Sequence, residues 1–252
     1  MMTNTYPKNF ARFYDVIYNK VRNTVDYEFF LNQIKQTKGT VLEIGVGTGR
    51  FFMNALQSGA DIYGCDISEE MLGVLKKKLD KDQYQRISRQ NIIDFTYDFT
   101  FDLIIAPFRV IMHVLEKGEQ INALNNVYNY LNSGGRFIFD VFVPDLKQLI
   151  DGIKNQVDFI DEYEPGKKLK RTVSTRPDLI NQLINIHFQL EWDEDNLVKT
   201  EDWKLSLRFF FRYELEHLLE RSRFDRYTIL GDYQGNGLNE TSKEFIAVCQ
   251  KK

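Results

Sequence analysis

The chain has 252 residues, of which 43% are hydrophobic and 27% charged, and these values are ordinary for a soluble globular protein. Its 20 Phe, 13 Tyr and 2 Trp residues need a dry interior, which excludes disorder as the main state of the chain. The formal net charge of −3 gives no support to a nucleic-acid-binding or membrane-binding surface, so we expect neither partner.

The cellular compartment of the protein is predicted from sequence features that membrane and secreted proteins have. We find no apolar run near the ~20 residues that a membrane-spanning helix needs, and the first ten residues do not resemble a secretory signal. Two cysteines, Cys65 and Cys249, cannot form a disulfide framework. We therefore expect a cytoplasmic protein.

The predicted elements begin with an N-terminal helical cap over about residues 8–37. Within it, residues 10–21 place apolar and aromatic side chains at helical spacing, which indicates an amphipathic helix. A short apolar strand over residues 40–44 then runs into the glycine cluster of residues 45–49. This order predicts a strand, a tight turn and a helix in succession.

Strands and helices continue to alternate after the glycine cluster. A helix is predicted from Arg50 to Gly59, followed by a strand over residues 61–66. Ser68 is the expected N-cap of the next helix, because its hydroxyl can accept from an early backbone N–H.

Two further strands are predicted, over residues 101–106 and 136–143, with a helix between them that ends at Gly134 and Gly135. Strands that alternate with helices favour a parallel sheet covered on both faces, so the fold class is α/β.

The pattern changes at about residues 155–211. Apolar and polar residues alternate with period two over residues 184–192 and 203–209, which is typical of antiparallel strands with one wet face. A turn is expected at residues 176–178. We interpret the whole chain, residues 1–252, as a single domain with a small antiparallel sheet inserted. A helix and two strands are then expected over residues 213–220, 225–231 and 244–250.

The segment Glu43-Ile44-Gly45-Val46-Gly47-Thr48-Gly49 is the sharpest motif. Glycines between a strand and a helix let the backbone approach a ligand closely, and free N–H groups at the helix start can contact its polar atoms. Asp66 ends the next strand, where a carboxylate can accept from a ribose diol. A dinucleotide fingerprint needs a third glycine where this chain has Arg50, so the spacing disfavours a nicotinamide cofactor.

With these residues in place, the sequence resembles the class I S-adenosylmethionine-dependent methyltransferases. The resemblance rests on VLEIGVGTGR at 41–50, GCDISEEML at 64–72, FDLIIAP at 101–107 and LNSGGRFIFDVF at 131–142. It implies a Rossmann-like, seven-stranded and mostly parallel sheet whose last strand is antiparallel, with S-adenosyl-L-methionine as cofactor and S-adenosyl-L-homocysteine as product.

The resemblance also implies the roles of the cofactor-site residues. The three glycines would pass beside the cofactor and Glu43 would lie near its methionine end, while Asp66 would hold the ribose. Asn91 stands where the family often has an acid that contacts the adenine amino group, and its side-chain carbonyl can accept the same hydrogen bond. The cofactor-binding set is Glu43, Gly45, Gly47, Gly49, Asp66, Ile67, Met71, Asn91 and Ile92.

Candidate catalytic residues are fewer, because methyl transfer from a sulfonium needs alignment more than a base. Tyr14 and Tyr18 lie one helical turn apart and border the methyl group in similar enzymes, although packing alone would also explain them. Arg109 and His113 follow the strand predicted over residues 101–106 and could share one helix face. His113 could act as a base near neutral pH, or could be a packed histidine.

Other polar groups give weaker signals. We find no grouping of Cys, His, Asp and Glu with metal-ligand spacing, so no metal is expected. The basic stretch of residues 167–171 is interpreted as a solvated strand edge.

The predicted function is transfer of a methyl group from S-adenosyl-L-methionine to nitrogen or oxygen of a small-molecule acceptor. The inserted sheet, Tyr14–Tyr18 and the tail Gly231-Asp232-Tyr233 resemble enzymes that act on amino sugars and other small amines. The alternatives are a non-catalytic S-adenosylmethionine-binding protein and, disfavoured by the glycine spacing, a nicotinamide-dependent oxidoreductase. The oligomeric state is left open between monomer and homodimer.

Overall fold

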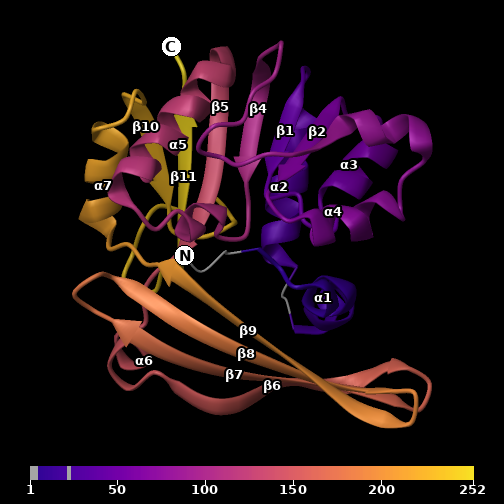
Figure 1. Ribbon diagram of the computed structural model, residues 1–252. Coiled ribbons are helices and arrows are strands. Elements are labelled where there is room, and N and C mark those ends of the chain that lie inside the picture. Colours follow the sequence, from indigo (N-terminus) through magenta and orange to yellow (C-terminus); the bar gives the residue numbers. More distant parts are fainter. Residues whose placement is uncertain (1–4, 22–23) are drawn as a thin grey trace.

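The computed structural model describes residues 5–21 and 24–252, and it contains two β-sheets (Figure 1). The first sheet has seven strands in the order β10-β11-β5-β4-β1-β2-β3, and the second has four in the order β6-β7-β8-β9. In Figure 1 the four-stranded sheet lies below the seven-stranded one, and helix α1 (Lys8–Val21) lies between them on the right.

The seven-stranded sheet confirms the predicted class I architecture. Its central strands pair in parallel, while β11 pairs antiparallel with both β5 and β10. The order in which the strands are added reverses between β1 and β4, and in open α/β sheets ligands bind at the carboxyl ends of the strands at such a point. The strands are β1 (Val41–Ile44), β2 (Ile62–Asp66), β3 (Ile87–Arg89), β4 (Phe101–Ala106), β5 (Leu131–Phe142), β10 (Arg226–Leu230) and β11 (Glu244–Gln250).

Helices cover both faces of this sheet and explain its continuous apolar strands. One face packs on α5 and α7, and the other packs on α2, α3 and α4. All four residues of β1 are buried, as a strand covered on both sides requires. The covering helices are α2 (Val25–Gln36), α3 (Phe52–Gln57), α4 (Glu69–Lys76), α5 (Lys117–Tyr130) and α7 (Arg212–Glu220), and short helices η1 (Lys81–Arg86) and η2 (Val110–His113) also occur.

The boundary between α5 and β5 differs from the prediction. Helix α5 ends at Tyr130 instead of at the glycine pair, and β5 begins at Leu131. The glycines lie inside the strand, where the backbone N–H of Gly134 donates to Lys251 and the carbonyl of Gly135 accepts from it. A register shift between Phe101 and Leu103 accommodates this irregular start. The glycines therefore shape the edge of a strand rather than stop a helix.

The inserted sheet is a four-stranded antiparallel meander that faces α1. Its strands are β6 (Ile153–Glu164), β7 (Lys167–Asp178), β8 (Leu183–Glu194) and β9 (Leu197–Arg208), preceded by α6 (Leu146–Asp151). The expected turn at residues 176–178 was wrong, because these residues pair with β8 as the last part of β7. The inner face of the sheet and α1 share one apolar cluster, which includes Phe13, Leu190 and Trp203.

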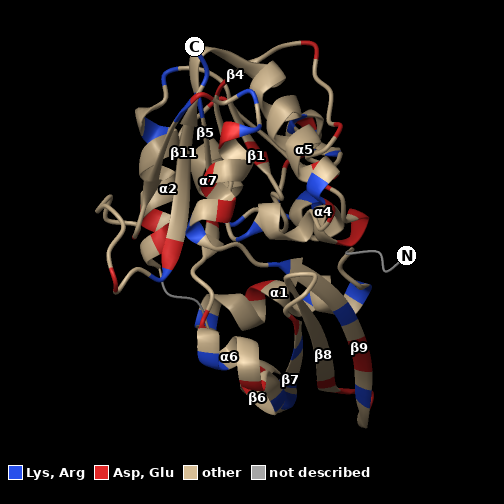
Figure 2. Cartoon of the chain, turned by 90° about the vertical axis from the view of Figure 1, so that its left-hand side faces the viewer, with Lys and Arg blue, Asp and Glu red and all other residues tan. Residues whose placement is uncertain are grey.

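Charged residues of both signs are interspersed over the two sheets and their helices (Figure 2). Among the residues that the structure describes, no helix is long and apolar enough to cross a membrane.

Candidate active site

The glycine loop turns sharply at the carboxyl end of β1. Gly45, Gly47 and Gly49 have backbone φ values of 71°, 55° and 89°, in a region that residues other than glycine rarely adopt. A Cβ atom at Gly45 would lie 2.4 Å from Cγ2 of Val110, so the segment after β4 passes directly against the loop. The sequence therefore needs glycine here for two reasons, the backbone angle and the close approach.

Asp66 lies at the end of β2 and contacts the glycine loop, as predicted. Its carboxylate accepts hydrogen bonds from the backbone N–H of Gly47 at 2.9 Å and of Ser68 at 2.8 Å. Burial raises the pKa of Asp66 above its ordinary value, and these two hydrogen bonds oppose that rise. Ser68 caps α4, since its hydroxyl accepts from the N–H of Met71. The loop and the carboxylate are thus joined by a hydrogen bond at the carboxyl ends of β1 and β2.

Glu43 is buried inside the sheet, two residues before the loop, with 2% of its surface exposed. Within the described residues its Oε2 atom has no hydrogen-bond partner. Burial raises the pKa of this carboxyl well above its ordinary value, while the backbone N–H of Phe52 opposes the rise. A buried polar atom without a partner is rare in folded proteins, so Glu43 is a candidate for a contact with a bound ligand.

Met71, Asn91 and Ile92 are further predicted cofactor contacts, on the segments that follow β2 and β3. Met71 is buried, and its Cε atom lies 3.3 Å from the position that a Cβ of Gly47 would occupy. Ile92 is buried below Asn91, whose side-chain oxygen accepts from the N–H of Ile93 at 3.2 Å. That oxygen therefore fixes a turn, and a contact with adenine would have to use its second lone pair.

Helix α1 places its two candidate tyrosines beside the segment that follows β4. The rings of Tyr14 and Tyr18 lie 4.4 Å apart between centroids, and Tyr18 packs edge-on against Phe108 at 5.7 Å. Tyr14 also meets Tyr6 at 5.6 Å. The structure thus brings together the tyrosines and the fourth-strand loop, which the sequence analysis placed at the site separately.

A polar clasp that the sequence analysis missed joins α1 to the glycine loop. The carboxylate of Asp15 accepts from the Thr48 hydroxyl at 2.6 Å and pairs with Lys78 Nζ at 2.6 Å. Lys78 also donates to the carbonyl of Thr48 at 2.8 Å. An acid between two tyrosines on a helix and a threonine within the glycine motif were the available signals. This clasp holds α1, and with it Tyr14 and Tyr18, against the glycine loop.

The segment after β4 is strained and is held by a buried ionic cluster. Phe108 and Arg109 have φ values of 58° and 68°, and such residues typically raise the energy by ~1–3 kcal/mol each. Arg109 pairs with Glu244 at 2.7 Å and approaches Asp140 to 4.0 Å. Asp140 accepts from the hydroxyl of Tyr233 at 3.0 Å, and its carboxyl pKa is raised by burial. Arg109 is thereby committed to the protein's own carboxylates.

His113 ends the short helix η2 and is half-buried. Burial lowers the pKa of His113 to about 4, so its imidazole is neutral at pH 7. The expectation that Arg109 and His113 share a helix face was wrong, because η2 begins at Val110 and Arg109 precedes it in a left-handed conformation.

Arg171 corrects the interpretation of the basic stretch. It is 5% exposed on the inner face of β7, where Asp158 accepts from its guanidinium at 3.0 and 2.8 Å. The guanidinium carbon lies 4.9 Å from the ring centroid of Tyr18 and 4.8 Å from that of Phe188. Strand alternation turns this residue inward, while Lys170 on the opposite face pairs with Glu191. The inserted sheet therefore contacts the candidate site through Arg171.

Two cavities lie away from the glycine loop. An apolar hollow of about 330 Å³ adjoins α6, and a more polar cavity of about 270 Å³ is lined by Val25, Tyr233 and Glu244 together with other residues of the β10–β11 connection. Within the described ranges, no group of three or more His, Cys, Asp and Glu side chains is arranged to hold a metal ion.

Comparisons with known proteins agree with this geometry. The family model of the methyltransferase domain matches residues 42–137, which include most of β1, the glycine loop and β4. An uncharacterized methyltransferase of Bacillus cytotoxicus is 30% identical over 132 residues, 52% of this chain and 59% of that protein. The chain thus spans about half the length of the curated relatives it matches.

Solved structures are similar over nearly the whole chain. An S-adenosylmethionine-dependent methyltransferase from Clostridium acetobutylicum has a TM-score of 0.75 at 18% identity, over 96% of this chain and 98% of that one. A sugar N-methyltransferase from Streptoalloteichus has a TM-score of 0.75 at 13% identity, over 100% and 96%. At such identities the likeness shows the fold. Residues 42–137 therefore match the methyltransferase domain family, and the chain has the fold of the class I S-adenosylmethionine-dependent methyltransferases.

Proposed function

We propose that this protein transfers a methyl group from S-adenosyl-L-methionine to nitrogen or oxygen of a small-molecule acceptor, leaving S-adenosyl-L-homocysteine. The proposal rests on the hydrogen bond between Gly47 of the glycine loop and Asp66. This contact places glycine backbone and a carboxylate together where the strand order of the sheet reverses, which is where such sheets bind ligands. Glu43 supports it as a buried acceptor without a partner in the described structure.

The residues present fit this cofactor. Asp66 would accept hydrogen bonds from the ribose hydroxyls, the three glycines would line the backbone path, and Ile67, Met71, Asn91 and Ile92 would border the adenosine. Glu43 would accept from a donor at the methionine end. The bound cofactor supplies the reactive methyl group, and the protein supplies its orientation.

The acceptor would lie between α1, the segment after β4 and the inserted sheet. Tyr14, Tyr18 and Phe108 form an aromatic wall there, and Arg171 fixes Tyr18 from the inserted sheet. Positioning the acceptor in line with the methyl group can provide much of the rate without a dedicated base. One of the solved neighbours is an amino pentose methyltransferase from Micromonospora echinaspora, which supports a small amine or sugar acceptor.

A base role for His113 stays a prediction. With a pKa of about 4 its neutral imidazole would be a weak proton acceptor at pH 7. An unchanged pH–rate profile in His113→Ala would assign the residue to packing. The nicotinamide alternative gains no support, because Arg50 at the third-glycine position is engaged by Asp26 at 2.8 Å.

The test is a methyl-transfer screen with a donor that carries a trideuterated methyl group. Mass spectrometry of candidate amines, amino sugars and phenols should show one acceptor that gains the labelled group, with equimolar S-adenosyl-L-homocysteine. Tight donor binding without product from any acceptor would favour the non-catalytic alternative.

We also propose a domain organisation, a cellular location and a set of partners for the protein. We take residues 1–252 as a single methyltransferase domain, with a helical cap at about 8–37 and the inserted sheet at about 155–211. A cytoplasmic setting rests on Cys65 and Cys249, which are buried and unpaired. We expect neither nucleic acid nor membrane as a partner, and a monomer or homodimer.

A further inference from the structure

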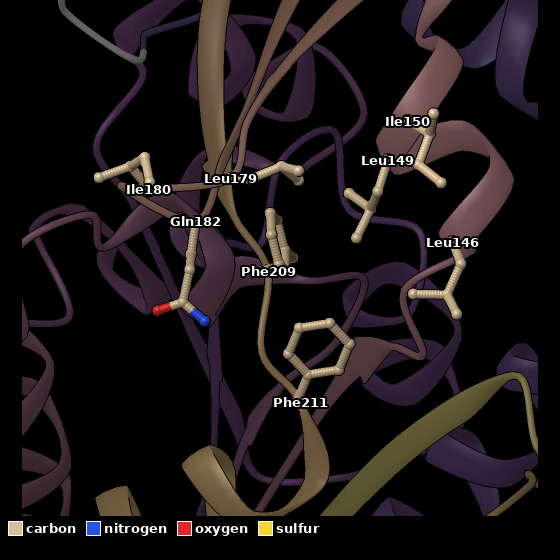
Figure 3. A pocket seen from close by; sticks show the side chains of 8 residues that line it. All are labelled: Leu146, Leu149, Ile150, Leu179, Ile180, Gln182, Phe209 and Phe211. Atoms are coloured by element: carbon tan, nitrogen blue, oxygen red, sulfur yellow. The ribbon is translucent and has the colours of Figure 1, made fainter.

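A patch of exposed apolar side chains lies beside α6, on the opposite side of the molecule from α3 and α4 (Figures 1 and 3). Its members come from α6, from the turn between β7 and β8, and from the segment before α7. They are Leu146, Ile150, Leu179, Ile180 and Phe211, with exposed fractions of 65, 77, 55, 92 and 45%. We call these five residues the α6 patch.

The α6 patch surrounds a hollow of about 330 Å³. Leu149 and Phe209 form part of its wall, and Gln182 is the single polar residue that lines it. The amide of Gln182 donates to the carboxylate of Glu214 at 2.8 Å, so one of its two N–H donors is already used. Figure 3 shows this amide on the side away from the leucines of α6. The lining of the hollow is thus mainly apolar and fits a hydrocarbon group.

Ile180 projects from a turn that is fixed in place. Asp178 accepts from the backbone N–H of Asn181 at 3.0 Å and from its side-chain amide at 2.8 Å. The carbonyl of Gln182 accepts from the N–H of Phe209, which ties the turn to the end of β9. A turn whose backbone is already held by hydrogen bonds loses little conformational entropy when a partner covers it.

The area of the α6 patch suits a stable interface. At roughly 180 Å² for a fully exposed large residue, its exposed fractions correspond to about 600 Å² of accessible surface, most of it apolar. A standard interface buries ~800 Å² per partner, and in homodimers ~65% of that is apolar, which is about 500 Å². The patch alone thus reaches the apolar area that one side of a homodimer interface needs.

We infer that the α6 patch is the contact of a symmetric dimer, in which Ile180 of each copy enters the hollow of the other. A two-fold contact requires one surface that complements itself, and a projecting residue beside a matching hollow meets that requirement. Transient partners use more polar surfaces than homodimers do. Membrane-binding helices are rich in Lys and Arg, whereas α6 carries one charge of each sign, Lys147 and Asp151.

Sedimentation velocity of the full chain between about 1 and 100 µM tests the inference. The chain of 29.8 kDa should sediment as a species of twice that mass. Ile180→Asp should raise the dimer dissociation constant at least about 100-fold, because a carboxylate would be buried in a hydrocarbon hollow. Both variants in this test replace exposed side chains, and circular dichroism and thermal unfolding would establish that they fold.

Ile160→Asp is the matched control. Ile160 is 66% exposed on the edge strand β6, outside the α6 patch, and its replacement should leave the dimer unchanged. A dimer that survives Ile180→Asp, or one that Ile160→Asp dissolves, would overturn the inference and assign the contact to another face such as the β6 edge. A wild-type protein that stays monomeric at 100 µM would overturn it as well, whether or not it binds phosphatidylcholine vesicles.

Discussion

Removing the carboxylate of Asp66 is the sharpest perturbation of the proposed cofactor site. In the free protein this group accepts two backbone hydrogen bonds, from Gly47 and Ser68. With cofactor bound it would also accept from the ribose hydroxyls. The variant Asp66→Ala removes every one of these bonds, while Asp66→Asn keeps the shape and one oxygen but loses the charge.

The magnitude follows from hydrogen bonds to a charged group. Each contributes about 1.5–3 kcal/mol, so the loss of two from a ribose diol should weaken binding by about 3 kcal/mol, or roughly 150-fold. Asp66→Asn should lose about half of that free energy, roughly tenfold in affinity. Because burial raises the pKa of Asp66 above its ordinary value, wild-type affinity should also fall as the pH drops through that raised pKa.

Isothermal titration calorimetry with S-adenosyl-L-homocysteine is the assay, and thermal unfolding would show that each variant folds. Asp61→Asn serves as the matched control, because Asp61 immediately precedes the same strand at its opposite end and pairs with Arg86 at the surface. Its affinity should stay within twofold of wild type. A folded Asp66→Ala protein that binds within twofold of wild type would refute the ribose role.

Three other predictions test the surroundings of the site. Asp15→Ala removes the clasp between α1 and the glycine loop, so cofactor affinity should fall about tenfold in calorimetry and amide exchange in α1 should accelerate. Gly45→Ala should lower the free energy of unfolding in urea by at least about 2 kcal/mol more than Gly59→Ala, because Gly59 shares a positive φ but has open space around its Cβ position; equal losses would contradict the close approach. Burial raises the pKa of Glu244 from 4.5 to about 7, so the folded state binds the proton more tightly and stability should decrease by about 3 kcal/mol as the pH rises from 4.5 to 7. Glu244→Gln should abolish that slope in urea titrations, and an unchanged slope would exclude Glu244 as its source.

Local patterns in the sequence were sufficient for the parallel sheet and for the contact between the glycine loop and Asp66. Strand β1, the glycine loop and Asp66 follow one another within 26 residues, and turn chemistry and burial act over that range. The N-cap Ser68 was predicted from local signals as well, and the structure confirms it. The helix end at the glycine pair was predicted wrongly, because pairing with Lys251 at the far end of the chain decides that boundary.

The polar partners of the candidate site could not be predicted, since they join residues far apart in the sequence. Arg171 belongs to a basic stretch that looked solvated, and its burial depends on α1 lying across the inserted sheet. Arg109 had no evident partner until the fold placed Glu244, 135 residues later, beside it. Such contacts depend on tertiary packing, which periodicity does not encode.

A crystal structure of the protein with S-adenosyl-L-homocysteine tests the central claim most directly. The account predicts the ligand at the carboxyl ends of β1 and β2, beside the protein backbone of residues 45–49. The sugar hydroxyls of the ligand should donate to Asp66, and its amino-acid end should lie toward Glu43. The α1 tyrosines should face its sulfur. A crevice that stays empty at saturating ligand, or a nicotinamide nucleotide that binds there in its place, would contradict the account.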